Sequence, residues 1–496
     1  MTDFFNKLFS RYPVKTRRFL ELLPGLVSWT LILFPIWGSL LIPSVLTYFI
    51  LFFDIYWFYK SFSLVVYSFI GTNQIRKAQK QNWLAKAESL PNFHNVTHVL
   101  IIPNYQERVE KLRETIISLT HQTFPHTRLF IVLAMEEREK DGKEKADKLT
   151  AEFGSKFGGF FATFHPDIPG EVKGKSSNES FGGKVAYELL VQTGKIDNNL
   201  ATISSIDADS IFDPQYFSYL SYAFLSDKHP YNRFWQSANV TYNNFWQVPA
   251  PVRVASFFGS LYRTALLIQK DRLVSNSTYS LSFKMLADIG FWDTDVIPED
   301  YRIFFKAFFS LKGDLTVEPI FLKTSMDAPL SSSYWKSLRN TYDQQRRWSW
   351  GVSDDPLFIK WWLTVPHVPF FRKTMMLYHV LLDHFLWPVN WFIITVAANI
   401  IPFVNPAFTR TSLGYNLPRL AGVILTTCLF ATLAMIAIDF RNRPHHKVSK
   451  LKQFLFPLEF VLLPIVGLFL ATIPALISHT QLMLGKRIEY KVTEKL

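Results

Sequence analysis

Two acidic residues stand at the end of a predicted buried strand, in the stretch "SSIDADSIF". Asp207 and Asp209 lie two residues apart, and the strand is expected over residues 201–207. Two carboxylates at this spacing in a turn can bind one hard divalent cation, which would hold the oxygens of a nucleotide diphosphate. An acidic turn leading into a helix is a common alternative, so the motif alone leaves a metal site undecided.

A second acidic pair, Glu299 and Asp300 in "PEDYRIFFKAFF", precedes an apolar pattern of helical period. One of these carboxylates could remove a proton from an acceptor hydroxyl. Carboxylates also stabilise helix N-termini through the helix dipole, and Asp293 and Asp295 are close by in the sequence. The pair by itself is therefore weak evidence for catalysis.

The stretch "TYDQQRRWSW" at residues 341–350 combines cations with indole rings. Arg347 could neutralise a leaving diphosphate, and Trp348 could stack against the face of a sugar. The same composition, followed by Trp361 and Trp362, is natural at a membrane interface, where Trp and Arg gather. Spacing alone does not choose between an active site and an interface anchor.

Two further stretches are weaker still. In "GEVKGKSSNES", Lys175 and Asn178 follow glycines and open a helix, whose N-terminus is a ready anion site. A solvated loop explains that stretch equally well. In "VLIIPNYQER", Pro103, Tyr105 and Glu107 follow a buried strand, and nothing about this residue set is diagnostic by itself.

The composition favours a membrane protein of more than one unit. The chain has 496 residues, a formal net charge of +13, 49% hydrophobic residues and 47 phenylalanines. The positive charge suits nucleic acid, anionic lipid or phosphorylated substrates without choosing among them. A single cysteine, Cys428, excludes an intramolecular disulfide framework and a cysteine-based zinc site. No cleavable signal peptide is expected.

Apolar runs divide the chain into parts. We expect a cytoplasmic N-terminus over residues 1–22, a transmembrane hairpin over 23–72 that turns at Pro43, and a soluble domain over 86–374. The C-terminal membrane region covers 375–484, and a cytoplasmic tail covers 485–496. Within it, 375–404 and 417–440 form a second hairpin. Residues 454–483 are ambiguous, and a re-entrant or interfacial hairpin is one solution. Basic residues on both sides of the first hairpin place the soluble domain in the cytoplasm.

The soluble part alternates strand and helix patterns. Strands are expected over 97–103, 128–135 and 201–207. Helices are expected over 108–122 and 213–225, and a third helix is expected to begin within 136–149. In the helix over 213–225, Asp213 would be the N-cap and Pro214 the first helical residue. Repeated units of this kind predict a mostly parallel sheet, with ligands at the carboxyl ends of its strands.

The five polar stretches occur in one order, inside one α/β domain, between two membrane regions. This arrangement resembles the membrane-embedded family 2 glycosyltransferases, which include the cellulose, chitin and hyaluronan synthases. The resemblance implies a GT-A (Rossmann-like) domain flanked by transmembrane helices. It also implies transfer of a sugar from a nucleotide diphosphate sugar, usually a UDP-sugar, with inversion at the anomeric carbon.

The resemblance assigns roles to the motifs. Asp207 and Asp209 would contact Mg²⁺ or Mn²⁺ and the donor phosphates, and Asp300, beside Glu299, would be the general base. Trp348 would contact the acceptor sugar. The residues expected near the donor are Pro103, Tyr105, Glu107, Lys175, Asn178, Gln344 and Arg347.

Two positions depart from the family pattern. "AMEER" stands where the family has paired aspartates, one of which recognises uracil, so Glu136 or Glu137 is expected to take that role. The longer side chain leaves the identity of the base open. Pro298 replaces the usual threonine before the acidic pair.

We therefore expect a multi-pass enzyme of the plasma or inner membrane that extends a polysaccharide and could translocate it. Its partners would be a nucleotide sugar, the acceptor and membrane lipid, but no nucleic acid. A transferase that adds one sugar to a lipid acceptor and an inactive membrane scaffold are the alternatives. Trp348 would then stack on sugar while Trp350 or Trp361 meets lipid.

Overall fold

The described residues form one mixed eight-stranded sheet, which is the centre of the domain between the apolar segments. The computed structural model describes residues 2–444 and 448–489. Strand order across the sheet is β3-β2-β1-β4-β7-β6-β8-β5. The strands are β1 (Thr97–Asn104), β2 (Leu129–Glu136), β3 (Gly159–His165), β4 (Ala201–Ser205), β5 (Ile211–Phe212), β6 (Arg233–Val240), β7 (Tyr279–Ser282) and β8 (Thr316–Ser325).

The sheet has two halves of different pairing. β1 pairs in parallel with β2 and β4, and β2 pairs in parallel with β3. Beyond β4 the pairing is mixed, because β7 runs antiparallel to both of its neighbours and β5 runs antiparallel to β8. β6 and β8 are parallel, with a register shift between Ser237 and Ala238. The predicted mostly parallel sheet is thus correct for four of the seven strand pairs, and the other three pairs, all beyond β4, are antiparallel.

Alternate side chains of the strands feed two hydrophobic cores. On β1, Val99 and Ile101 face one core, while Leu100 and Ile102 face the other. Because both faces are covered, β1 and β2 have continuous apolar runs rather than an alternating pattern. The first core is completed by α7 (Lys175–Ala186), α9 (Ala250–Leu266) and α11 (Glu299–Ser310), and the second by α5 (Val109–Thr120), α6 (Gly142–Phe153) and α8 (Tyr216–Ser226).

One predicted helix start is wrong. α8 begins at Tyr216 instead of Pro214, because the Asp213 carboxylate accepts the Gln215 N–H at 3.1 Å and forms a separate turn before the helix. The helix start expected within residues 136–149 is confirmed, because α6 begins at Gly142, after a turn that follows the end of β2 at Glu136. The shorter helices of this part are α4 (Trp83–Glu88) and α10 (Phe283–Asp288).

Within residues 2–444 and 448–489, four helices are long and apolar enough to cross a membrane, and a bent pair makes up to five. Three of them are α2 (Pro13–Leu41), α3 (Pro43–Gln79) and α18 (Ser412–Asn442). The bent pair joins α14 (Phe370–Leu386) to the segment Asn390–Val404, at 52°. That segment comprises α15 (Asn390–Phe392), the π-helical turn η8 (Ile393–Ala397) and α16 (Ala398–Val404), and α17 (Pro406–Thr409) leads into α18.

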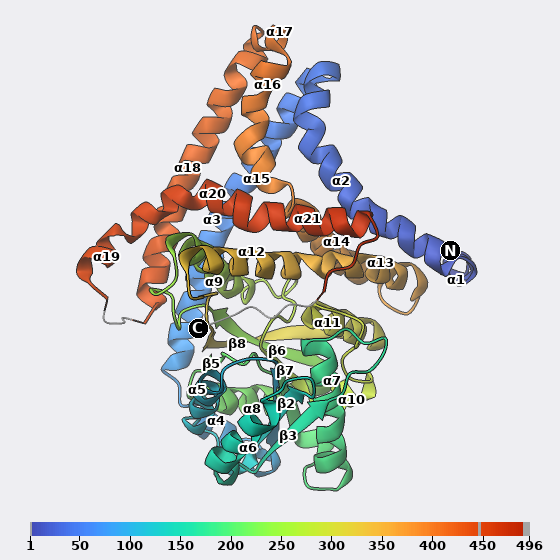
Figure 1. Cartoon of the computed structure of the whole chain (residues 1–496), viewed down its shortest axis with the longest axis vertical. Helices are drawn as coiled ribbons and strands as arrows, with labels where there is room; N and C mark the ends of the chain where they lie inside the picture. The colour runs from blue at the N-terminus through green and yellow to red at the C-terminus, as the bar shows by residue number, and fades with distance from the viewer. Residues whose placement is uncertain (1, 445–447, 490–496) are drawn as a thin grey trace.

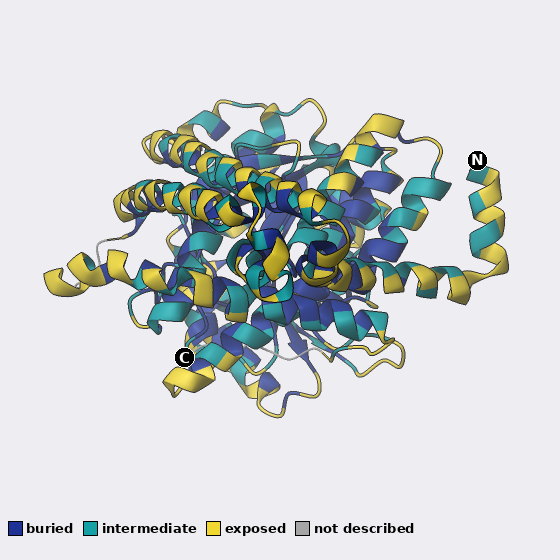
Figure 2. Ribbon diagram, turned by 90° about the horizontal axis from the view of Figure 1, so that it is seen from above, coloured by how far each residue is buried: buried dark blue, intermediate teal, exposed yellow. Residues whose placement is uncertain are grey.

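The apolar helices rise together from one side of the domain (Figure 1). Much of their outer surface is exposed, as the view from above illustrates (Figure 2). Exposed side chains there include Leu41, Phe52, Val423 and Phe430, which suits contact with lipid. The predicted turn at Pro43 is confirmed, because α2 ends at Leu41 and α3 begins at Pro43.

The remaining apolar segment, Lys450–Met483, runs across the other apolar helices near their domain-side ends (Figure 1). It is one continuous series of helical pieces, so the predicted hairpin is wrong, while its course across the other helices fits the interfacial alternative. The pieces are α19 (Lys450–Leu455), η9 (Phe456–Leu462), α20 (Leu463–Gly467), η10 (Leu468–Thr472) and α21 (Ile473–Met483). Prolines lie near the starts of η9, α20 and α21, where a missing N–H costs least.

α21 lies between α2 and α12 (Tyr334–Ser349). The Trp29 indole donates to the Thr480 hydroxyl at 3.0 Å, and Gly25 lies against Met483. On the other side, the Ser349 hydroxyl donates to that of Ser478 at 3.0 Å. α12 is followed by α13 (Asp355–Thr364), against which the N-terminal helix α1 (Thr2–Arg11) packs. The pair His445–His446 and tail residues 490–496 lie outside the described residues.

α9 connects the sheet to the apolar helices. Gly71 of α3 faces Thr264 so closely that an added Cβ would lie 2.6 Å from the Thr264 carbonyl oxygen. Rings of Phe257 in α9 and Phe460 in η9 are 4.7 Å apart. The domain is therefore packed directly against the membrane region.

Gly71→Ala should consequently separate α3 from α9. Because the carbonyl is backbone and cannot rotate away, we expect a loss of about 1–3 kcal/mol in the free energy of unfolding. Thermal unfolding of the purified protein in detergent measures it. Gly422→Ala in α18 is the matched control, because no heavy atom lies within 4 Å of its added Cβ. Equal melting temperatures for the two variants would contradict this packing.

Candidate active site

A cavity of about 210 Å³ opens at the carboxyl ends of the parallel strands. The structure brings every candidate residue predicted from the sequence to its wall. They are Pro103, Tyr105, Glu107, Glu136, Lys175, Asn178, Asp207, Asp209, Glu299, Asp300, Gln344, Arg347 and Trp348. Strand ends supply one side of the cavity, and α9, α11 and α12 supply the other.

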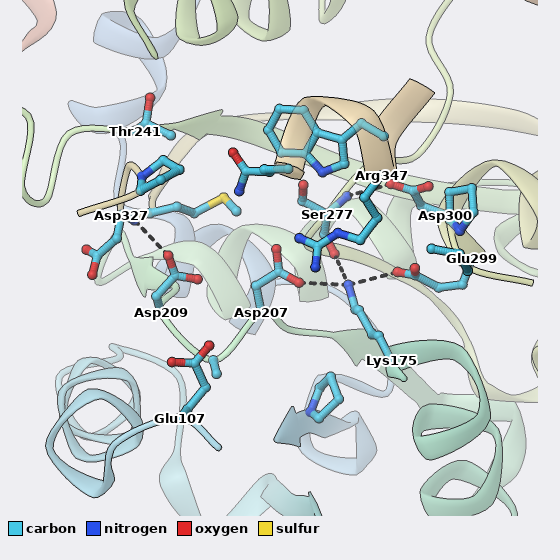
Figure 3. A pocket seen from close by; sticks show the side chains of 18 of the residues that line it. Glu107, Lys175, Asp207, Asp209, Thr241, Ser277, Glu299, Asp300, Asp327 and Arg347 are labelled. Atoms are coloured by element: carbon cyan, nitrogen blue, oxygen red, sulfur yellow. Dashed lines mark hydrogen bonds and ion pairs between the residues drawn. The ribbon is translucent and has the colours of Figure 1, made fainter. Parts of the chain in front are cut away.

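The ammonium of Lys175 lies at the centre of these groups (Figure 3). It donates to Asp207 Oδ1 at 2.8 Å and to the Ser277 carbonyl at 2.7 Å, and it is paired with Glu299 Oε1 at 2.8 Å. Burial alone would lower the pKa of Lys175, but Asp207, Glu299 and Glu179 raise it well above its usual range. Lys175 is therefore a permanent cation that joins two acidic motifs.

The turn after β4 presents Asp207 and Asp209 to the cavity. The Asp207 N–H donates to the Thr278 hydroxyl at 3.1 Å, and Asp209 Oδ2 accepts the Asp327 N–H at 2.8 Å. Glu107 points toward this turn from the opposite loop (Figure 3). The two aspartates are thus held in place from outside their own loop.

The donor set of this turn fits a cation that is shared with a substrate. Among the described residues, no group of three or more His, Cys, Asp or Glu side chains could hold a metal alone. Mg²⁺ characteristically takes one or two carboxylates and completes its shell with water and substrate phosphates. Asp207 and Asp209 match that requirement.

The two acidic residues at the start of α11, Glu299 and Asp300, have different partners. Glu299 is committed to Lys175, whereas the Asp300 carboxylate accepts the N–H groups of Ser277 at 3.1 Å and Tyr301 at 2.9 Å. Burial raises the pKa of Asp300, opposed by Lys175, and raises the pKa of Glu299 to about 7, again opposed by Lys175. Asp300 is the carboxylate without an ammonium partner.

The nearby acids Asp293 and Asp295 belong to another cluster. Each lies 3.3 Å from the Arg302 guanidinium, and Asp293 also pairs with Lys306 at 2.7 Å. Neither residue lines the cavity.

α12 closes the cavity with one face. Gln344, Arg347 and Trp348 are spaced three and four residues apart, so a helix brings them to one side. Arg346 lies on the other side and donates to Gln481 of α21 at 2.8 Å. Trp350 is only 3% exposed, so the expectation that it could meet lipid is wrong.

Glu136 ends β2 and lines the cavity, whereas Glu137, which follows it, is exposed and does not. Glu136 pairs with Arg138, whose guanidinium lies 3.8 Å above the ring of Tyr105. The side chain of Asn178 links the neighbouring strands β1 and β2. Its amide donates to the Ala134 carbonyl at 2.6 Å and to the Asn104 carbonyl at 3.4 Å.

Sequence reasoning missed two charged residues of the wall, Asp327 and Arg263. Asp327 follows β8 and pairs with Lys111 at 2.8 Å, so the strand-end rule could have found it. Arg263 is in the last turn of α9, where a cation normally complements the helix dipole. No local signal distinguished it.

The family comparison agrees with the motifs. Residues 202–438 match the family described as "Glycosyl transferase family group 2". This match confirms the resemblance drawn from the ordered motifs and, with the sheet, the predicted α/β fold of GT-A type. No curated protein matches the chain in sequence.

Two solved structures are among those that match the chain. One is the mannosyltransferase PcManGT from Pyrobaculum calidifontis in complex with GDP-Man and Mn²⁺. It is 14% identical, with a TM-score of 0.44, over 76% of this chain and 98% of that one. The other is S. aureus TarS 1–349 in complex with UDP-GlcNAc, 11% identical with a TM-score of 0.38, over 80% and 94% of the two chains.

Binding of Mn²⁺ should depend on both the turn after β4 and a nucleotide diphosphate. Because two carboxylates leave the shell incomplete, we expect weak binding alone and at least about tenfold tighter binding with UDP or GDP. Asp209→Asn should abolish that enhancement. Asp295→Asn is the control, since Asp295 is exposed and outside the cavity. Calorimetry measures both, and an unchanged enhancement in Asp209→Asn would contradict the assignment.

Proposed function

We propose that this chain, whose residues 202–438 match the family described as "Glycosyl transferase family group 2", extends a polysaccharide by inverting transfer from a nucleotide diphosphate sugar, specifically a UDP-sugar. The observation that carries this proposal is the convergence of Asp207, Asp300 and Arg347 on one cavity. Asp207 comes from a strand end, Asp300 from α11 and Arg347 from α12. The three supply a phosphate site, a base and a cation, which are the groups that the reaction requires.

The donor lies along the strand ends. Tyr105 and Glu136 border its base, and Lys175 and Arg347 bring positive charge to its diphosphate. Asp207 and Asp209 would hold Mg²⁺ or Mn²⁺, which when bound neutralises the diphosphate as it leaves.

Asp300 takes the proton from the acceptor hydroxyl. The acceptor oxygen then forms its bond to the anomeric carbon as the bond to the diphosphate breaks, with the electron pair leaving on the diphosphate. Arg347 stabilises that developing charge. Glu299 cannot share the role of base while it is paired with Lys175, so it positions Lys175 instead.

Trp348 supports the acceptor. It is 39% exposed at the cavity and belongs to the helix that packs on α21. A sugar stacked on this indole would lie between the catalytic groups and the membrane helices. Basic residues lie in the N-terminal part of α2 and the last turns of α3, at the helix ends nearer the catalytic domain: Arg17, Arg18, Arg76 and Lys77. This arrangement supports a cytoplasmic domain and a location in the plasma or inner membrane.

The runner-up is transfer of one sugar to a lipid acceptor. It is favoured by α9, which lines the cavity with one face and touches α3 and η9 with others. Sizing the product formed from a panel of labelled nucleotide sugars separates the two, since a polymer supports extension and a single glycolipid supports the runner-up. Absence of any donor turnover would leave the inactive scaffold.

Asp300→Asn should abolish transfer to a hydroxyl acceptor. General-base removal costs about 10²–10⁴-fold in rate, while the donor contacts remain. Release of the nucleotide diphosphate measures transfer, and calorimetry with the free nucleotide measures donor binding. Transfer close to the wild-type rate would show that Asp300 is not the base.

Trp348→Ala should weaken the acceptor and spare the donor. Loss of the stacking face should raise the acceptor KM by about tenfold, corresponding to ~1.4 kcal/mol. Trp335→Ala is the matched control, because Trp335 is on the same helix, 76% exposed and outside the cavity. If both variants keep the wild-type acceptor KM, the acceptor platform is elsewhere.

A further inference from the structure

Lys60 is a cation inside the apolar helix α3, and its side chain is half-buried. Among residues 2–444 and 448–489, no hydrogen bond or ion pair joins its ammonium to a protein group. The ammonium lies 5.7 Å from the ring centroid of Tyr56, one turn earlier in the helix. An unpaired lysine in a membrane helix is costly unless its ammonium reaches a headgroup or an anionic ligand.

The position of Lys60 along α3 corresponds to one edge of the bilayer. Lys60 comes 17 residues after Pro43, where α3 begins, so the helix rises about 26 Å between them. The hydrocarbon core is about 30 Å thick, so Lys60 lies near its boundary on the side of the catalytic domain. The neighbouring side chains of Tyr59 and Ile55 are exposed, as expected where a helix faces lipid.

The charges around Lys60 leave its own charge unbalanced. Arg272, in the turn after α9, donates through Nη2 to both carboxylate oxygens of Asp383 in α14, at 2.9 and 3.1 Å. Both of these charges act on Lys60, but they balance each other. The next acid along the chain, Asp271, is 74% exposed and therefore solvated.

Buried polar atoms without a hydrogen-bond partner surround this ammonium. Within the described residues they are the Tyr56 hydroxyl, Nε of Arg272 and both ring nitrogens of His379 in α14. The charge of Arg272 acts on Tyr56, and the charges of Arg272 and Lys60 act on His379, so these side chains lie near one another. Buried donors without an acceptor are rare in folded proteins, because each costs free energy. Several such donors beside an unpaired cation point to an anionic ligand.

The chemistry of these groups matches a phosphate. A phosphate carries negative charge, which Lys60 can balance, and several acceptor oxygens, which hydroxyl and N–H donors can bind. Basic sites between membrane helices at headgroup depth are suited to anionic lipid. Lys60, Tyr56, Arg272 and His379 all lie outside the catalytic cavity, so a ligand bound here is separate from the sugar donor and acceptor.

We propose that Lys60, Tyr56, Arg272 and His379 form a binding site for the phosphate of an anionic membrane lipid, between α3, α14 and the turn after α9. A free phosphate ion has the same oxygens, but the site opens beside lipid-facing side chains of α3, along which acyl chains would lie. The inference goes beyond the proposed glycosyl transfer and does not depend on it.

The experiment measures lipid binding to the purified full-length protein in detergent, with no sugar donor present. Native mass spectrometry titrates dioleoyl phosphatidylglycerol and dioleoyl phosphatidylcholine, which has the same chains but no net charge. We expect phosphatidylglycerol to bind at least about fivefold more tightly, because the site has one unbalanced cation. Inorganic phosphate at the same concentration should not displace it.

Lys60→Gln should weaken the binding of phosphatidylglycerol by at least about fivefold, whereas Lys60→Arg should retain it. Tyr56→Phe removes only the hydroxyl and should weaken binding about threefold. Lys15→Gln is the matched control, since Lys15 is exposed near the start of α2, at the same side of the membrane. Melting temperatures of the variants show that they are folded, and Tyr56→Phe decides the question if Lys60→Gln is not.

Three results would overturn the inference. The first is equal affinity of the wild type for the two lipids. The second is an equal loss of affinity in Lys60→Gln and Lys15→Gln, which would mean attraction by the overall positive charge. The third is displacement of the lipid by inorganic phosphate, which would make the ligand a free ion. Failure of the proposed glycosyl transfer is distinct, because it would leave all of these affinities unchanged.

Discussion

The shared ammonium of Lys175 is the interaction on which the geometry of the cavity depends. It joins the turn after β4, the start of α11 and the loop before β7 through Asp207, Glu299 and the Ser277 carbonyl. Glu179 lies 3.8 Å away on the same helix. Carboxylates this close and this buried would repel one another without a central cation, and their pKa values would rise further. Donor site and base are therefore one electrostatic unit.

The geometry of α12 explains why residues 341–350 could be interpreted both as part of an active site and as a membrane-interface anchor. Its helical period sends Arg347 and Trp348 to the cavity and Arg346 to α21. Catalytic wall and membrane-side packing surface are opposite faces of the same helix. Residues adjacent in the sequence thus serve different environments.

The residues that line the cavity could be predicted from the sequence better than the order of the strands in the sheet. Asp207, Tyr105 and Glu136 could be placed together because parallel strands end at a common edge, and periodicity could place Arg347 beside Trp348. The insertion of β7 between β4 and β6 could not be predicted, since strand order depends on contacts distant in the chain. Arg263 was missed for a similar reason, because its environment is made by neighbours from other elements. Asp213 was predicted to be the N-cap of α8, but its carboxylate forms a local turn before the helix.

The loop that bears Asp207 and Asp209 also has little spare length. It leaves β4 and enters β5, and three strands lie between them in the sheet. In a flat sheet the four inter-strand spacings from β4 to β5 add up to about 19 Å. This distance is close to the full length that the chain can span in the six residues from Ser205 to Ile211. Part of that length is used by the turn in which the Ser210 N–H donates to the Asp207 carbonyl. The sheet must therefore curl to bring β5 within reach, and the register shift between Ser237 and Ala238 is where a strand pair can bend. Curvature at a distant edge of the sheet thereby sets the position of the two carboxylates.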